Sequence, residues 1–218
     1  MHVINKLIAS VALTTTLAAG SAHAVTVVNY SFEVPSMGGG YQYDPSGAGW
    51  TFSGYSVIAN YQSGFYFSTP PDGTQVGVLQ SASNNGSSID QVLSGLASGD
   101  SYTVSFYLAD RANPNGTRYL ANPVTVSFDG TNIGTYTPTS IDFQLFTATF
   151  TAASASGDLM FLAAANGGDL DTGLDLVTVS AAAPSATPLP AALPLFASGL
   201  GVMGWLARRR KRKAQAAA

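Results

Sequence analysis

The residues best suited to chemistry in this sequence are the carboxylates. There is one glutamate, Glu33, and there are eleven aspartates. Hydrolysis of a glycosidic bond needs two carboxyl groups about 5 to 10 Å apart, one protonated and one ionised. No such pair stands out, because most of the aspartates lie in turns or at strand ends, where Asp bonds the backbone. Carboxylates in loops are also the hard oxygen ligands that calcium prefers, so the acids favour a calcium site over a catalytic pair.

Other catalytic side chains are missing from most of the chain. The sequence has no cysteine, and its two histidines, His2 and His23, both lie near the N-terminus. Their absence further along excludes Ser-His-Asp and Cys-His nucleophilic catalysis and argues against zinc, copper and haem sites. We therefore expect that the protein is not an enzyme, with a carboxylate or metal-assisted hydrolase as the least favoured alternative.

Aromatic residues form a second candidate site. Tyr41 lies in a glycine-rich stretch, and Tyr61 and Tyr66 lie in a loop that is crowded with rings. Flat rings at the end of a loop can stack on sugar faces, and the phenolic hydroxyls remain free to hydrogen-bond. We expect Tyr41, Tyr61 and Tyr66 to contact a ligand. The alternative is that these rings only plug the open ends of the fold.

The elements that must hold these residues are strands. From Ser101 to Leu108 apolar and polar side chains alternate, which is typical of a half-buried strand. Asp129-Gly130 is a hairpin-type turn between two further strands. About ten strands are expected, at Val25–Ser31, Trp50–Ile58, Gln75–Gln80, Ser88–Leu93, Ser101–Leu108, Val124–Phe128, Ile133–Tyr136, Phe143–Thr151, Leu159–Ala164 and Leu174–Ser180. Short strands separated by Gly, Pro and Asn turns predict an all-β jelly-roll β-sandwich over residues 25–180.

Short motifs in this region carry a resemblance to a known family. They are Asn29-Tyr-Ser-Phe-Glu33, Gly49-Trp50, Pro71-Asp-Gly73, Ile89-Asp-Gln91, the turn and strand from Gly95 to Tyr102, and Leu174-Asp-Leu-Val177. Their order is similar to that in carbohydrate-binding modules with the galactose-binding-like jelly roll. A structural calcium in those modules commonly lies near the first and last strands. The resemblance therefore implies Glu33 and Asp175 as calcium ligands and a carbohydrate as the ligand.

The charge of this region argues against one class of partner. Residues 25–183 contain two arginines, Arg111 and Arg118, no lysine and all twelve acidic residues, which gives a formal charge of −10. A surface of this sign cannot neutralise a row of phosphates. We expect no nucleic-acid binding.

The N-terminus has the features of a secretory signal peptide. Lys6 precedes an apolar run from Leu7 to Ala19, and Ala22-His-Ala24 is a small-residue cleavage site. Such a segment is removed on export. Residues 1–24 are therefore expected to be the signal peptide, and Val25 the start of the mature chain.

The C-terminus has the features of a membrane anchor. After an Ala- and Pro-rich linker at residues 181–188, residues 189–207 carry no charge. As a helix they would reach roughly 28 Å, close to the thickness of a bilayer core. Six cations follow, Arg208 to Lys213, and the positive-inside rule places this tail, residues 208–218, in the cytoplasm. One transmembrane helix over residues 189–207 is expected.

This arrangement resembles the C-terminal sorting signals of the PEP-CTERM class of Gram-negative bacteria, in the Pro-Leu-Pro-Ala variant. The residues that carry the resemblance are Pro188, Leu189, Pro190, Ala191, Arg208, Arg209 and Arg210. It implies recognition by a membrane-embedded exosortase, cleavage near the proline motif, and release to the cell surface or extracellular matrix. The alternative is an ordinary stop-transfer end that keeps the chain in the membrane.

Taken together, these patterns predict an exported β-sandwich protein of a Gram-negative bacterium. It would be held transiently in the inner membrane and then reach the surface, where its domain binds extracellular polysaccharide. The alternative is a structural or adhesive matrix protein that binds no sugar specifically.

Overall fold

The computed structural model describes residues 25–82, 86–117, 122–165 and 168–182, together with residues 196, 200, 201, 203–205, 208 and 209. The chain divides into two compact units, Met1–Ala182 and Ala183–Ala218. The described part of the first unit contains eleven strands.

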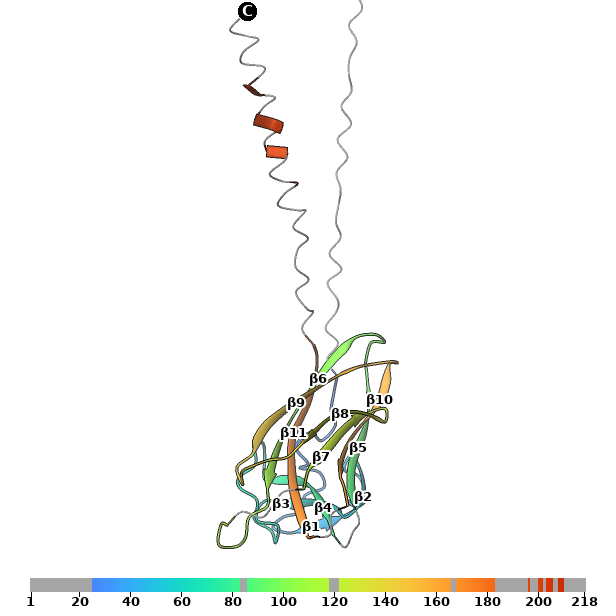
Figure 1. Ribbon diagram of the computed structural model, residues 1–218. Helices are drawn as coiled ribbons and strands as arrows, with labels where there is room; N and C mark the ends of the chain where they lie inside the picture. Colours follow the sequence, from blue (N-terminus) through green and yellow to red (C-terminus); the bar gives the residue numbers. More distant parts are fainter. Residues whose placement is uncertain are drawn as a thin grey trace, which may run out of the picture. The chain divides into compact units, whose positions relative to one another are not determined.

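These strands form two antiparallel sheets packed face to face as a sandwich (Figure 1). The six-stranded sheet has the order β1 (Tyr41–Tyr43), β3 (Ser56–Asn60), β4 (Gln75–Ser81), β11 (Leu170–Ala181), β6 (Ser101–Asp110), β9 (Gln144–Thr151). The five-stranded sheet has the order β2 (Thr51–Gly54), β5 (Ser87–Ser94), β10 (Ser156–Ala163), β7 (Val124–Phe128), β8 (Thr131–Tyr136). The expected all-β sandwich is confirmed.

The core between the sheets is built from the inward-facing half of each strand. In β5 and β10 buried residues alternate with more exposed ones, as the two-residue period requires. The ring of Phe106 lies 5.1 Å from that of Phe161, which in turn lies 6.3 Å from that of Trp50. Each fully buried large side chain contributes about 1.5 to 3 kcal/mol. Trp50 lies in this core, as expected from its alternation with Phe52.

One expected strand is divided between the two sheets. The sequence predicts a single strand from Trp50 to Ile58, but the chain passes from the five-stranded sheet to the six-stranded one at Gly54. Gly54 has φ +73°, and a Cβ there would come within 2.3 Å of the carbonyl oxygen of Gly86. Only glycine fits this crossing. Its flanking segments become β2 and β3.

The expected strand from Val25 to Ser31 is wrong, because the chain turns at Asn29. Asn29 has φ +50°, and its carbonyl accepts a hydrogen bond from the Phe32 amide. Its side-chain amide donates to the Ala48 carbonyl at 2.8 Å. Val25 and Val27 in this segment are still buried. The alternation therefore predicted burial correctly, although the segment forms no strand. The short strand β1 was not predicted, since its glycine-rich surroundings indicated a loop.

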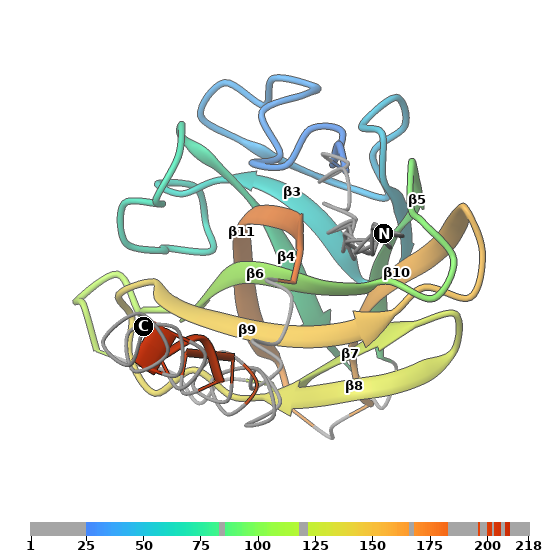
Figure 2. The same ribbon diagram turned by 90° about the horizontal axis from the view of Figure 1, so that it is seen from above.

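The hairpin signal at Asp129-Gly130 is confirmed as the turn between β7 and β8. Both residues have positive φ, +47° and +74°, as the favoured two-residue hairpin turn requires. The edge strand β8 lies beside β9, the edge strand of the other sheet, at one flank of the sandwich (Figure 2).

The described residues of the second unit are helical. Within it the guanidinium of Arg209 lies 4.6 Å from the centre of the Trp205 ring. Among the described residues, no helix is long and apolar enough to cross a membrane. Most of the expected span over residues 189–207 lies outside the described residues. The remaining residues of the expected sorting motif, Pro188, Leu189, Pro190, Ala191 and Arg210, lie outside the described residues, as do Ala22, Ala24 and the rest of the expected signal peptide.

Candidate functional site

The six-stranded sheet carries a second apolar layer on the side that faces away from the core. Alternate residues of β3 and β4 belong to two different clusters: Leu79 joins the core, whereas Val78 packs with Phe65 and Phe67. These two rings come from the loop of residues 61–68. A Cβ at Gly173 on β11 would come within 2.8 Å of the Phe67 ring. The absence of a side chain at Gly173 therefore lets the loop lie directly on the sheet.

A pocket of about 370 Å³ opens between loop 61–68 and the loop of residues 112–116. Its lining includes Tyr61, Tyr66, Phe67, Ala112, Pro114 and Ile141, and none of its lining residues is charged. The Ala112 amide donates to the Tyr66 carbonyl at 3.1 Å, which joins the two walls. The pocket is therefore an uncharged hollow with aromatic walls.

The structure brings two of the three predicted ligand-binding tyrosines together and leaves the third apart. Tyr61 and Tyr66 both line the pocket, whereas Tyr41 does not. The Tyr41 ring stands edge-on to Phe65, 5.1 Å between centres, and 5.9 Å from the Tyr43 ring. Tyr41 and Tyr43 thus form an exposed pair of rings that both contact Phe65.

Polar residues join these aromatic regions around a single arginine. Arg111, the first residue after β6, makes ion pairs with Asp171 at 2.5 Å and with Asp169 at 3.3 Å. It also donates to the Gly64 carbonyl at 3.2 Å, and its guanidinium lies 5.4 Å from the centre of the Phe65 ring. One cation therefore contacts both β11 and loop 61–68.

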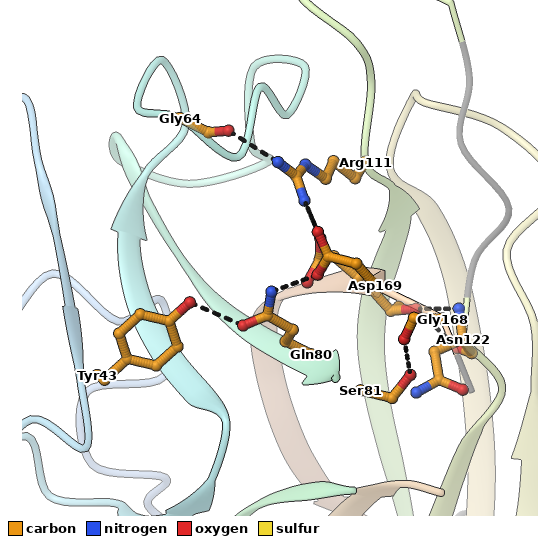
Figure 3. Close-up of polar contacts among 10 residues, drawn as sticks. Tyr43, Gly64, Gln80, Ser81, Arg111, Asn122, Gly168 and Asp169 are labelled. Atoms are coloured by element: carbon orange, nitrogen blue, oxygen red, sulfur yellow. Dashed lines mark hydrogen bonds and ion pairs between the residues drawn. The ribbon is translucent and has the colours of Figure 1, made fainter. Parts of the chain in front are cut away.

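The network continues toward the exposed tyrosine pair. The Tyr43 hydroxyl donates to Gln80 Oε1 at 2.8 Å, and Gln80 Nε2 donates to Asp169 Oδ1 (Figure 3). Asp169 accepts in turn from Arg111 (Figure 3). A continuous path of hydrogen bonds thus runs from β1 across β4 to the end of β6.

Asp171 is the buried acid of this network. Its side chain is fully shielded from solvent, and burial raises its pKa to about 6, although Arg111 acts in the opposite direction. The nearby Asp169 carboxylate adds to the rise. Among the described residues, Asp171 Oδ1 has no hydrogen-bond partner. Protonation of Asp171 is therefore easier than for an exposed aspartate.

A second buried acid, Asp175, lies four residues further along β11. It precedes a β-bulge, where Leu176 has φ +48°. Asp175 Oδ2 accepts from the Asp72 amide at 3.1 Å, and Oδ1 has no hydrogen-bond partner within the described ranges. Burial raises the pKa of Asp175 to about 7; backbone N–H groups of Asp72 and Leu176 oppose the rise, and the carboxylates of Asp72 and Glu33 add to it.

Glu33, the other expected calcium ligand, lies close enough to Asp175 to raise its pKa. Glu33 Oε1 accepts from the amides of Thr74 and Gln75 at 2.8 and 2.7 Å. In the part of the chain that the structure describes, no three carboxylates are arranged so that they could hold a metal ion. Calcium at Glu33 and Asp175 stays a prediction.

The sequence analysis did not find the cluster of Arg111, Asp169, Asp171 and Gln80. Arg111 and Asp171 are 60 residues apart, and only the pairing of β4, β11 and β6 brings them together. One signal was present: residues 171 and 175 have the even spacing that places both acids on one face of a strand.

The structure is thus a β-sandwich domain with an uncharged pocket that is partly walled by aromatic rings. Residues 23–160, more than half of the chain, match the HpiC1-like family, whose description is HpiC1 cyclase. The chain therefore belongs to this family. No curated protein that was compared with the chain matches it.

Solved structures with the same fold include enzymes and a sugar-binding domain. A cyclase from Fischerella sp. TAU is 18% identical, with a TM-score of 0.59, and the match covers 77% of this chain and 100% of that one. The cyclase from that organism in complex with 4-(1H-indol-3-yl)butan-2-one is 17% identical, with a TM-score of 0.58 and coverages of 75% and 99%. The CBM22-1 xylan-binding domain of Paenibacillus barcinonensis Xyn10C is 12% identical, with a TM-score of 0.50 and coverages of 77% and 100%.

The expectation that the protein is not an enzyme is wrong, because the chain belongs to a cyclase family. The absence of histidine and cysteine from the domain excluded nucleophilic catalysis only. Acid or base catalysis by a carboxyl group needs neither residue. The resemblance to the fold of carbohydrate-binding modules is confirmed by the xylan-binding neighbour.

Proposed function

We propose that the domain binds a ring-bearing ligand, a sugar residue of an extracellular polysaccharide, in the pocket between loops 61–68 and 112–116. The observation that carries this proposal is the pair Tyr61 and Tyr66 in an uncharged pocket of about 370 Å³. Pockets of some 300 to 1,000 Å³ lined by rings and a few polar groups are typical of small-ligand sites.

The polar residues of the pocket suit a neutral sugar. The side chains of Gln62, Ser68 and Asn113 line it and supply amide and hydroxyl groups for hydrogen bonds. The two tyrosines offer faces for the apolar side of a pyranose ring. A neutral sugar needs no charged partner, and the pocket supplies none.

The test compares two exposed tyrosines. Tyr66 is 39% exposed and lines the pocket, whereas Tyr30 is 44% exposed and does not. In a pull-down of the full chain with the producer's own polysaccharide, Tyr66→Ala should weaken binding about tenfold, for a stacking contact of about 1.4 kcal/mol. Tyr30→Ala should leave binding unchanged. No binding by a folded wild-type chain would favour a structural or adhesive matrix protein instead.

A second candidate function is catalysis on a small ring-bearing substrate, and membership of a cyclase family supports it. The compound to titrate first is 4-(1H-indol-3-yl)butan-2-one, because it occupies one of the cyclase neighbours. Competition between this compound and the polysaccharide would show that both use one pocket. If neither compound nor polysaccharide displaced the other, the two functions would need separate sites.

We also propose that the chain is exported and sorted through its C-terminal segment by an exosortase-type enzyme. This proposal is supported by the order of the proline motif, the uncharged run and the cluster beginning at Arg208. The mass of the mature protein from cells would report both cleavages at once. Deletion of residues 208–213 should misroute the protein without altering the fold of the domain, and unchanged surface display would count against sorting.

A further inference from the structure

Arg111 contacts two segments that are far apart in the sequence, whereas a simple surface ion pair joins only two side chains. Its guanidinium pairs with Asp169 and Asp171 next to and on β11, donates to Gly64, and lies over the Phe65 ring. Two of these partners belong to loop 61–68, and two belong to the last strand or the residues just before it. Arg111 therefore ties the loop to the sheet.

Both walls of the pocket depend on this attachment. One wall is loop 61–68, which Arg111 holds through Gly64 and Phe65. The other wall, residues 112–116, follows Arg111 directly in the chain. The hydrogen bond from the Ala112 amide to the Tyr66 carbonyl, 3.1 Å, closes the two walls against each other.

The two ion pairs of Arg111 differ in strength because they differ in exposure. The side chain of Asp169 is 60% exposed, whereas that of Asp171 is fully buried. Solvent screens the exposed pair with Asp169, and exposed ion pairs contribute little to the free energy of unfolding. The buried pair is shorter and unscreened, so it fixes the position of the guanidinium.

We propose that Arg111 is a positioning residue that sets the shape of the ligand pocket by holding loop 61–68 against β11, and that this hold requires the ionised form of Asp171. The part of this proposal that concerns ligand binding rests on the function proposed above. The attachment of loop 61–68 by Arg111 is independent of that function and can be measured without a ligand.

Three groups face Asp171 and bear on its ionisation: Arg111 at the end of β6, Asp169 before β11, and Tyr43 on β1. Burial and Asp169 raise the pKa of Asp171 to about 6, and Arg111 opposes them. Burial, with Asp171 next in effect, raises the pKa of Tyr43, so this phenol stays neutral throughout the relevant range. Because Arg111 lowers the pKa of Asp171, this pKa rises further when the arginine withdraws and Asp171 stays buried on β11. Protonation below about pH 6 therefore favours the loosened loop.

Hydrogen exchange of the full chain tests the hold directly. The reporter amides are Phe67, which donates to the Tyr61 carbonyl, and Ala112, which donates to Tyr66. After correction for the intrinsic pH dependence, both should exchange at least several times faster at pH 5 than at pH 8 in the wild-type chain. This comparison needs no variant, so it does not depend on any variant folding.

Variants then assign the effect to the arginine. Arg111→Gln should speed exchange of the two reporters about tenfold at pH 8 and should abolish their pH dependence. Arg111→Lys, which keeps the charge but loses the planar fork, should restore part of the protection. Asp158→Asn on β10, which removes another acid whose pKa burial raises, should leave both reporters unchanged.

The outcomes separate the two proposals. Faster reporter exchange together with weaker polysaccharide binding in Arg111→Gln supports both. If exchange is faster in Arg111→Gln but the wild-type chain itself binds no polysaccharide, the role of Arg111 in holding the loop is supported. The proposal that the pocket binds polysaccharide is then overturned. Reporter exchange that is the same in Arg111→Gln and at both pH values overturns the role of Arg111.

Discussion

Asp171 and Asp175 form a natural comparison within one strand. Both lie on β11, on the same face, and both are fully buried. Asp171 is paired with the guanidinium of Arg111. Asp175 has no cation among its described contacts; it accepts from backbone N–H groups and faces the carboxylates of Asp72 and Glu33.

The difference shows two ways of tolerating a buried acid. Desolvation disfavours the charged form in both cases. At Asp171 a protein cation offsets part of this cost, and the pKa is about 6; at Asp175 nearby carboxylates add to the cost, and the pKa is about 7. The first acid has a cation of the chain as its partner, and at the second the neighbouring carboxylates favour the protonated form.

The largest expected effect is on pH-dependent stability at Asp175. Its folded pKa of about 7 lies above the ordinary value of 3.8, so its contribution is fully present below about pH 4 and is lost as pH rises through 7. In EDTA, the free energy of unfolding should fall by up to about 4 kcal/mol across this window. Urea unfolding measures it, and Asp175→Asn should remove most of the slope. An equal slope in the variant would contradict the assignment.

The next effect concerns the partner of Asp171. Arg111→Gln leaves a buried carboxylate unpaired and should cost about 3 kcal/mol at pH 8. At pH 5 the cost should be smaller, because Asp171 is then protonated. Asp169→Asn is the matched control and should cost less than about 1 kcal/mol, since that pair is exposed. Equal costs at both pH values would show that Arg111 stabilises the fold by packing alone.

Calcium should act at Asp175 and not at Asp171. At a hundredfold excess over its dissociation constant, calcium should stabilise the wild-type chain by about 2.7 kcal/mol, which thermal unfolding reports as a rise of several degrees. Asp175→Asn and Glu33→Gln should lose this rise, and Asp171→Asn should keep it. A melting temperature unaffected by either EDTA or calcium would rule out the site.

The smallest effect concerns the ring beside Arg111. Phe65→Leu keeps an apolar side chain but removes the contact with the guanidinium and the edge-on contact with Tyr41. The expected cost is about 1 kcal/mol, measured by urea unfolding at pH 8. Val92→Ala, at an exposed position on β5, is the control. A cost as small as that of the control would mean that the ring only fills space.

The sequence predicted most of the sandwich because alternation reports directly which side chains are buried. It failed where a backbone feature decided the outcome: the left-handed turn at Asn29 and the crossing at Gly54. Alternation says which residues are buried, but it does not say which strand a segment pairs with, or whether it pairs at all.

The site was predicted in part for a similar reason. Tyr61 and Tyr66 share one loop, so local sequence was enough to group them. Arg111 and Asp171 meet only through the pairing of β6 with β11, and nothing local marks them as partners. Tyr41 does not line the pocket, and its ring instead stands edge-on to Phe65. Phe67, which does line it, lies against β11 only because a distant residue, Gly173, has no side chain.

The hairpin turn at Asp129-Gly130 is a suitable place for an inserted tag. A side chain at Gly130 would meet nothing within 4 Å, and the turn joins two strands of the five-stranded sheet, whereas both buried acids belong to the other sheet. A short epitope inserted at this tip should leave the pocket and β11 untouched. Antibody labelling of intact cells would then report where the domain is displayed, independently of any ligand.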